Sequence, residues 1–277
     1  MDVYLPIANL SVNGLFIVAL GVLTGMLSGL FGVGGGFLTT PLLIFYGVPP
    51  TVGAASAASQ VTGASVSGVF AHSRHNGVDV QMGGVLVAGG VVGTGIGAII
   101  FNLLTRAGQI DTVINILYVL LLGGIGTIMA RESLATIRAE RSGEPIKPHK
   151  RRHHPIVANL PLRWRFYRSG LYISPLAPLL LGMVTGILTM LMGIGGGFVL
   201  VPAMLYILGM NANVVVGTSL FQILFVTMVT TMMHALTTKA VDIVLAVLLL
   251  FGSVSGAEIG GHFAQKASPV ELRLAAA

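Results

Sequence analysis

The stretch Gly32-Val33-Gly34-Gly35-Gly36-Phe37 interrupts a long apolar run, and Pro41 follows it four residues later. A second copy, Gly193-Ile194-Gly195-Gly196-Gly197-Phe198, interrupts another apolar run, with Pro202 at the same spacing. Three adjacent glycines weaken a membrane helix, because each one loosens the backbone and covers no neighbouring surface. Two such breaks at corresponding positions in the two halves of a chain are the best sequence indication of a transporter's binding site.

The composition around these stretches is that of a polytopic membrane protein. The chain has 277 residues, of which 54% are hydrophobic and 9% charged, and its mean hydropathy is +0.90; a soluble domain carries about 25% charged residues. The basic residues concentrate between Arg131 and Arg168. This pattern fits a cytoplasmic loop better than a nucleic-acid surface, so we expect no nucleic-acid partner. The absence of cysteine excludes disulfides and Cys-ligated metals. The N-terminus, whose only charge is Asp2, lacks a basic n-region, so we expect no cleavable signal peptide.

Seven apolar runs reach the length of about 20 residues that a membrane span needs. They cover residues 12–31, 52–72, 82–104, 111–130, 172–192, 214–235 and 243–264. Two shorter helices, 36–47 and 197–208, follow the glycine breaks, and at roughly 12 residues each they reach little more than half-way across the hydrocarbon core. We therefore predict an all-α integral membrane protein whose two broken helices lie within a lipid bilayer.

The two halves of the chain align with each other. Gly21–Gly25 matches Gly182–Gly186 at a separation of 161 residues, and Gln60 falls on Gln222 at 162. Only the first half has an extra span, 111–130, so an odd number of passes separates the breaks. The sequence therefore predicts two inverted repeats, with domains 1–130, 131–170 and 171–277.

Orientation follows from the basic connector, residues 131–170, which we place in the cytoplasm. Counting outward from it places the N-terminus outside and the C-terminus inside. We predict a multi-pass protein of a bacterial inner membrane, and a homodimer is left open.

The duplicated Gly-x-Gly-Gly-Gly-Phe with its trailing proline resembles the sulfite exporter TauE/SafE family, as do Gly77-Val78-Asp79 and Ala240-Val241-Asp242 after the next span. The resemblance covers residues 12–130 and 172–266 and leaves the connector unmatched. It implies export of sulfite, sulfonates or related small sulfur-containing anions. The family pattern has an aromatic residue after the aspartate, where Val80 and Ile243 stand here.

The glycine breaks are the first candidate substrate-binding groups. A helix that begins at Gly36 or Gly197 exposes unpaired N–H groups and the positive end of its dipole, which together bind anions without a basic side chain. The alternative role is close packing of small residues between helices. The candidate residues are Gly34, Gly35, Gly36, Phe37, Gly195, Gly196, Gly197 and Phe198.

Polar side chains on the spans 52–72 and 214–235 are the second candidates. Amides and hydroxyls hydrogen-bond oxyanions, and spacings of three and four residues place such groups on one helix face. The alternative role is hydrogen bonding between helices. The residues are Ser56, Ser59 and Gln60 in one span and Thr218, Ser219 and Gln222 in the other.

Glu258 is the one carboxylate away from the ends of a predicted span. Intramembrane ionisable groups are candidates for function, so proton coupling is one interpretation, with His262 one turn further on. The other is a carboxylate near the cytoplasmic mouth, solvated or paired with Lys266. We expect His72 and His234 to be interfacial.

Asp79 and Asp242 follow small residues at the start of spans and are predicted to be helix N-caps.

The sequence predicts a transporter for a small anion, sulfite or an organosulfonate, rather than an enzyme. It has no HExxH, Walker or GxSxG motif, and we expect no catalytic residue, no metal and no cofactor. The hypothesis places the anion between Gly34–Phe37 and Gly195–Phe198, in contact with Gln60 and Gln222. An anion channel and a membrane enzyme or assembly factor of sulfur metabolism remain alternatives, and uncoupled and proton-linked transport are both open.

Overall fold

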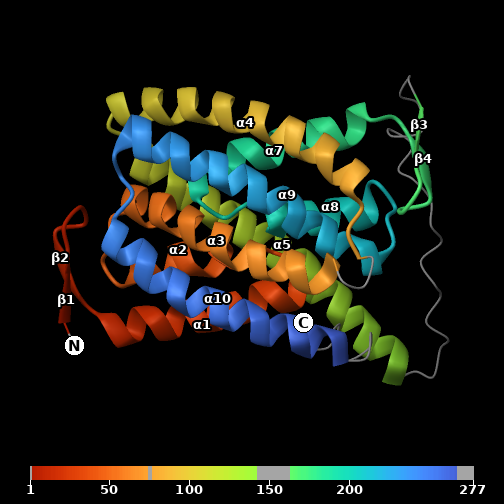
Figure 1. Cartoon of the computed structure of the whole chain (residues 1–277), viewed down its shortest axis with the longest axis horizontal. Helices are drawn as coiled ribbons and strands as arrows, with labels where there is room; N and C mark the ends of the chain where they lie inside the picture. The colour runs from red at the N-terminus through yellow and green to blue at the C-terminus, as the bar shows by residue number, and fades with distance from the viewer. Residues whose placement is uncertain (1, 74–76, 142–162, 267–277) are drawn as a thin grey trace.

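The computed structural model describes residues 2–73, 77–141 and 163–266 as a bundle of helices with two short β-hairpins (Figure 1). The segment 142–162 of the predicted connector lies outside the described residues. The helices are α1 (Gly14–Phe31), α2 (Gly36–Phe45), α3 (Pro50–Ser73), α4 (Val80–Arg106), α5 (Ile110–Arg141), α7 (Leu176–Met192), α8 (Gly197–Tyr206), α9 (Ala212–Met233), the π-helical turn η1 (His234–Thr238) and α10 (Ile243–Lys266).

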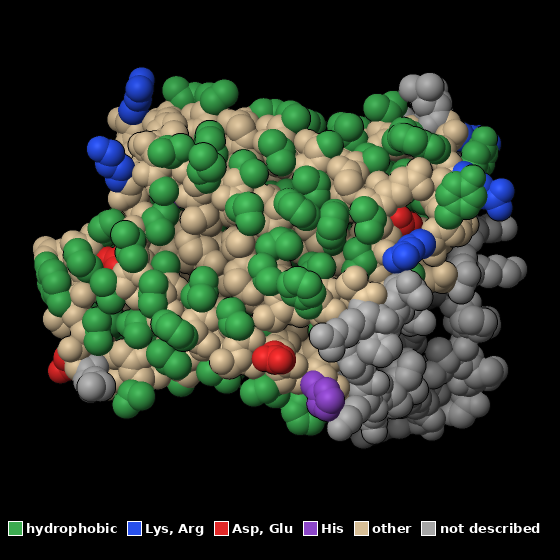
Figure 2. Space-filling model, in the orientation of Figure 1, with side chains coloured by type: hydrophobic (Ala, Val, Ile, Leu, Met, Phe, Trp, Pro, Cys, Tyr) green, Lys and Arg blue, Asp and Glu red, His purple; other side chains and the backbone are tan. Residues whose placement is uncertain are grey.

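The helices have the apolar character of membrane spans. Within the described ranges, three helical stretches are long and apolar enough to cross a bilayer by themselves: Val80–Arg106, Val214–Thr238 and Ile243–Phe263. Helices α1 and α7 are apolar but shorter, because each ends at a glycine break. Figure 2 shows hydrophobic side chains over the visible face, with the lysines and arginines at the two ends of the bundle. This distribution fits a protein surrounded by lipid.

Each glycine break is the bend of a helical hairpin. Helix α1 ends at Gly32, which adopts a left-handed conformation (φ +70°), and α2 begins at Gly36. The ring of Tyr46, just after α2, stacks on Phe16 in the first turn of α1 with 4.9 Å between ring centroids. The chain therefore returns along α1 to the end from which it came. In the second half, α7 ends at Gly193 (φ +72°) and α8 begins at Gly197.

Rows of glycine bring helices of the two halves into backbone contact. Helix α1 packs along α10, and α4 packs along α7 (Figure 1). A Cβ atom built on Gly25 would lie 2.6 Å from Ser253 Cα, and one on Gly186 would lie 2.9 Å from Gly90 Cα. The glycines recur every four residues, the spacing of small-residue contacts between membrane helices. They are Gly21, Gly25 and Gly29 on α1, Gly252, Gly256 and Gly260 on α10, Gly89, Gly93 and Gly97 on α4, and Gly182 and Gly186 on α7.

Two short β-hairpins accompany the helices of the predicted all-α bundle. Strands β1 (Asp2–Leu5) and β2 (Leu10–Asn13) form one hairpin, and β3 (Trp164–Phe166) and β4 (Leu171–Ile173) form the other. The pair Leu5–Leu10 in the first occupies the register of Phe166–Leu171 in the second, 161 residues on. Figure 1 shows the two hairpins at opposite ends of the bundle. Part of the predicted connector therefore belongs to the second hairpin, and α5 extends into it as far as Arg141.

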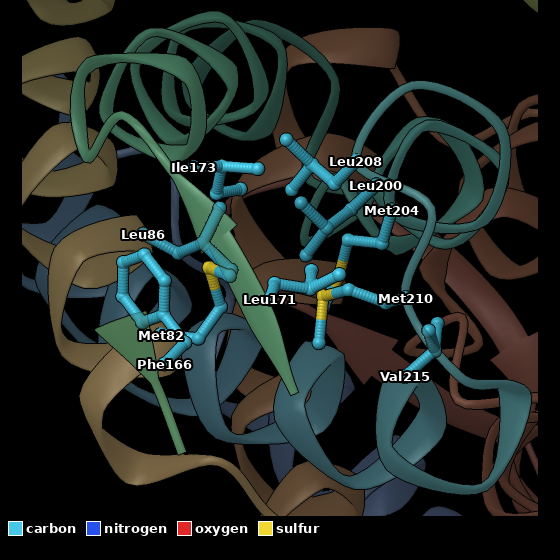
Figure 3. Close-up of a cluster of buried hydrophobic side chains, with 10 residues drawn as sticks. All are labelled: Met82, Leu86, Phe166, Leu171, Ile173, Leu200, Met204, Leu208, Met210 and Val215. Carbon is cyan, nitrogen blue, oxygen red and sulfur yellow. The ribbon is translucent and has the colours of Figure 1, made fainter. Parts of the chain in front are cut away.

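Each hairpin closes one end of the bundle over apolar side chains. Figure 3 shows the cluster at the β3–β4 end, where Phe166 and Leu171 meet Met82 and Leu86 of α4 and Leu200 of α8. A corresponding cluster at the β1–β2 end joins Leu5, Leu43 and Leu245. Burial of these side chains attaches the short helices α2 and α8 to opposite ends of the molecule.

Asp79 and Asp242 are N-caps, as predicted, and each also holds a hairpin. Asp79 Oδ1 accepts a hydrogen bond from the N–H of Met82 (3.0 Å), and its Oδ2 accepts from the N–H of Ser169 in the turn of the second hairpin (3.0 Å). Asp242 Oδ2 accepts from the N–H of Ile7 in the turn of the first hairpin (2.9 Å). Asp79 of the first half therefore binds the hairpin that precedes the second half, and Asp242 of the second half binds the hairpin that precedes the first.

Candidate functional site

The two glycine breaks meet inside the bundle. A Cβ atom on Gly36 would lie 2.7 Å from the carbonyl oxygen of Gly193, and one on Gly34 would lie 3.3 Å from that of Ile194. Directly after the breaks, the rings of Phe37 and Phe198 stack with 5.1 Å between centroids and 7° between planes. Thus the structure brings together the two motifs that the sequence singled out.

The breaks touch, and apolar side chains pack against the point of contact. Val61 of α3 and Ile223 of α9 fill the crossing: a Cβ on Gly34 would lie 3.1 Å from Val61 Cγ1 and 3.3 Å from Ile223 Cγ2. Both side chains are fully buried. The site is therefore closed and apolar at the point where the breaks cross.

Backbone geometry explains the need for glycine in the breaks. The φ angles are +90° at Gly34, +68° at Gly35, +77° at Gly195 and +72° at Gly196, values that other residues rarely adopt. A valine at Gly35 or Gly196 would therefore strain the backbone as well as occupy space. Such a variant tests folding more than binding, and the glutamines make better probes.

The first turns of α2 and α8 present unpaired N–H groups. The N–H of Leu38 donates to the carbonyl of Gly35 (3.1 Å), and that of Leu200 donates to Gly196 (2.9 Å). Among the residues that the structure describes, no hydrogen bond is found for the N–H groups of Gly35, Phe37 or Phe198. These donors, at the positive ends of the short helices, are what an anion requires.

Gln60 and Gln222 make equivalent hydrogen bonds to the helices that precede the breaks. Gln60 Nε2 donates to Thr24 Oγ1 of α1 (2.9 Å), and Gln222 Nε2 is 3.4 Å from Thr185 Oγ1 of α7. Both glutamines are fully buried, and their Oε1 atoms have no hydrogen-bond partner in the described part of the chain. A buried amide oxygen without a partner costs free energy, and it marks a place where a ligand gains by donating.

The predicted hydroxyl residues are divided between the breaks and the ends of the bundle. Ser219 Oγ donates to the carbonyl of Gly32 (2.9 Å), and Ser59 Oγ is buried without a partner among the described residues. Ser56 Oγ instead accepts from the N–H of Asp242 (3.1 Å), and Thr218 Oγ1 accepts from that of Asp79 (2.9 Å). These last two hydroxyls support the helix caps and do not reach the breaks.

Sequence reasoning missed the polar residues of α1 and α7. Thr24 and Ser28 of α1 are fully buried, as are Thr185 and Thr189, which lie 161 residues further on in α7. The available signal was the alignment of the halves, in which Thr24 and Thr185 match within the segments that precede the breaks.

The extra helix α5 fixes the second break. Tyr118 Oη donates to the carbonyl oxygen of Met192 at 2.6 Å, and Thr40 Oγ1 of α2 lies 3.4 Å from the same oxygen. Met192 is the last residue of α7, so its carbonyl lacks an intrahelical partner. Helix α5 has no counterpart in the second half, and the two breaks are therefore supported differently.

The ionisable residues lie apart from the breaks or are buried elsewhere. Glu258 is exposed on α10 and does not join the buried polar residues. His72 is half-buried. The interfacial prediction is wrong for His234, which is fully buried: its Nε2 lies 3.0 Å from the carbonyl of Met190, and its ring meets the edge of Phe101.

Apolar helices around two broken helices that meet at the centre define a polytopic membrane protein of the transporter class. Residues 17–277 match the family described as "Sulfite exporter TauE/SafE", and the chain belongs to this family.

Relatives with similar sequences carry transporter names. The chain is 27% identical over 257 residues to "Probable membrane transporter protein YjnA" of Bacillus subtilis (strain 168), a match covering 93% of this chain and 92% of the relative. It is 26% identical over 250 residues to a "Probable membrane transporter protein" of Xylella fastidiosa (strain 9a5c), covering 90% and 84%. No solved structure matches the chain significantly.

Proposed function

We propose that this protein exports a small sulfur-containing anion, sulfite or an organosulfonate, across a bacterial inner membrane. The single observation that carries the proposal is the meeting of two glycine breaks, each followed by a short helix with unpaired N–H groups. The family description supports a sulfur anion as the substrate and export as the direction.

The chemistry of the breaks suits an anion that must also leave. The described helices that form and flank the crossing, α1–α3 and α7–α9, contain no lysine or arginine, so the attraction comes from N–H groups, helix dipoles and buried amides. A buried full countercharge would hold an anion far more strongly. The N–H groups of Phe37 and Phe198 provide hydrogen bonds without such a charge, and each of Gln60 and Gln222 has one further amide N–H that can donate.

The architecture supports two inverted repeats as the moving parts. Hairpins of the same register lie at opposite ends of the bundle, and the helices that follow them carry the two breaks. In this proposal α2 and α8 approach the crossing from opposite sides of the membrane, with the N-terminus outside and the connector in the cytoplasm. The closed crossing favours a carrier over an open channel, because nothing passes until the breaks separate.

Reconstituted protein tests the proposal. Proteoliposomes loaded with sulfite should exchange radiolabelled sulfite at a rate that saturates with substrate. Taurine, sulfoacetate, thiosulfate and sulfate are compared as competitors.

Gln60→Ala and Gln222→Ala should each weaken binding by about 1–3 kcal/mol, the scale of a lost hydrogen bond to a charged group. Thr105→Val is the matched control, because its hydroxyl only bonds its own helix at Phe101. An unsaturable anion current would indicate a channel. Absence of exchange for every sulfur anion would overturn the proposal.

A further inference from the structure

We infer that each half of the molecule carries its own half-site, and that each half-site binds a singly protonated sulfur oxyanion such as hydrogensulfite. This inference rests on the proposed function and replaces a single central site with two. It follows from three observations: the residues beside each break, the apolar residues between the breaks, and the direction in which the buried glutamines accept hydrogen bonds.

The first half-site lies between the first break and α1. A Cβ on Gly35 would lie 2.7 Å from the carbonyl oxygen of Thr24 and 3.4 Å from Ser28 Cβ, so this side of the break faces α1 and not the other break. Ser28 Oγ and Gln60 Oε1 are both buried without a partner in the described chain. The hydroxyl of Ser28 and the N–H of Phe37 are available as donors, and Gln60 Oε1 is available as an acceptor.

The second half-site lies between the second break and α7. A Cβ on Gly196 would lie 2.8 Å from Thr185 Cβ and 3.1 Å from Thr189 Oγ1. Gln222 Oε1 is buried without a partner in the described chain, like its counterpart Gln60. The two half-sites are built from positions that correspond in the repeat, although Thr189 replaces Ser28 and already donates to the carbonyl of Thr185 (2.7 Å).

Apolar side chains separate the half-sites. Val61 and Ile223 directly follow Gln60 and Gln222 in sequence. A Cβ on Gly195 would lie 2.7 Å from Ile223 Cγ2 and 2.9 Å from Val61 Cγ1, so both side chains occupy the crossing itself. Thr227 also reaches Gly195, with its methyl group 3.2 Å from the same Cβ, but its hydroxyl already donates to the carbonyl of Ile223 (2.8 Å), so an oxyanion is poorly stabilised there. It is bound on one side or the other.

The hydrogen-bond network fixes which atom of each glutamine is free. Thr24 Oγ1 donates its proton to the carbonyl of Leu20 (2.9 Å), so it accepts from Gln60, whose Nε2 must face it. Thr185 Oγ1 likewise donates to the carbonyl of Gly182 (2.9 Å) and accepts from Gln222. This network assigns the amide orientations, in which both half-sites present an oxygen that only accepts.

A free acceptor beside several donors selects the protonation state of the ligand. Hydrogensulfite has oxygens that accept from N–H and O–H groups, and one proton that it can donate to the glutamine Oε1. A fully deprotonated dianion places lone pairs against that oxygen instead and leaves it unsatisfied. A sulfonate has no exchangeable proton, so it also leaves the glutamine Oε1 without a hydrogen bond.

Calorimetry on the purified full-length protein tests the inference, with sulfite titrated over a pH series and methanesulfonate as the unprotonated comparison. We expect two sulfites per chain, and affinity that falls at least tenfold once sulfite has lost its last proton. Gln60→Met and Gln222→Met remove the acceptor at similar volume, and each should reduce the stoichiometry to one. Ser28→Ala, which keeps the Gln60–Thr24 bond, should weaken only one of the two sites, and Thr105→Val should change nothing.

The outcomes separate this inference from the proposed function. One sulfite per chain in the wild type, or affinity that rises as sulfite loses its proton, would overturn the two half-sites while leaving sulfite transport intact. The methionine variants must first be shown to be folded, by size-exclusion chromatography. If both folded variants still bind two sulfites per chain, the role of the glutamines is refuted. If no sulfur anion binds or is exchanged at all, the proposed function fails as well.

Discussion

Replacing Gly93 by alanine tests whether the glycine rows hold the two halves together. Gly93 lies on α4 where its Cβ would meet the backbone of Met183 on α7, closer than real Cβ atoms approach their neighbours. Gly95, on the same helix, would meet nothing within 4 Å. Gly95→Ala is therefore a matched control with the same change of side chain in the same helix.

The structure gives the expected size of the effect. A carbon atom needs about 3.3 Å from a carbonyl oxygen, so Gly93→Ala forces α4 and α7 apart by roughly 1 Å, and overpacking of this kind costs about 1–3 kcal/mol. Both variants gain the same helix propensity of about 1 kcal/mol relative to glycine. That gain cancels in the comparison, and Gly93→Ala should be less stable than Gly95→Ala by about 1–3 kcal/mol.

Unfolding in detergent, followed by circular dichroism as denaturant is added, measures this difference. Gly95→Ala should unfold at or above the wild-type midpoint, and Gly93→Ala below it. Equal midpoints for the two variants would refute the packing argument, because the propensity gain is common to both. The corresponding contact of Gly25 with Ser253 on α10 provides an independent repeat of the test.

Two further predictions concern α5 and the topology. Tyr118→Phe leaves the carbonyl of Met192 with only the long contact from Thr40. We expect a stability loss of about 1 kcal/mol and slower sulfite exchange, and unchanged values for both would show that α5 does not support the second break. Cysteine at Lys239 should react with an impermeant reagent added to intact cells, and cysteine at Asn211 should not. Equal labelling of the two positions would contradict inverted repeats.

Much of the helical arrangement is predictable from the sequence because it follows apolar length and glycine. The breaks at Gly32–Gly36 and Gly193–Gly197 end helices within a residue or two of the predicted positions. The hairpins were not predicted, since strands of three or four residues leave little periodicity to detect. The glycine rows were visible as a four-residue spacing, but that spacing alone does not say which helices pair.

The candidate site was predictable in its parts and not in its geometry. The repeat pointed to Gln60 and Gln222, and the structure joins them to Thr24 and Thr185 of the helices that precede the breaks. The repeat did not reveal that Val61 and Ile223 fill the crossing, because apolar residues are expected throughout a membrane span. Nor did it show that Ser56 and Thr218 face the helix caps. A helical face can be read from spacing, but the neighbour that it meets depends on how distant helices pair.

The crosswise pairing of the halves restricts how the proposed half-sites can open. Helix α1 carries Thr24 and is held to α10 by backbone contacts at glycine, and α7 carries Thr185 and is held in the same way to α4. Such contacts resist sliding, because the backbones are already at closest approach at each glycine of the rows. Each pair should therefore move as one unit.

The contact between α3 and α9 is of a different kind. It includes the hydrogen bond from Thr62 Oγ1 to Thr227 Oγ1 (2.9 Å), close to Val61 and Ile223 in sequence. One hydroxyl pair exchanges partners more readily than a row of interlocked glycines. The motion that parts Val61 from Ile223 is therefore expected between α3 and α9, with the α1–α10 and α4–α7 pairs moving as rigid arms that carry one half-site each.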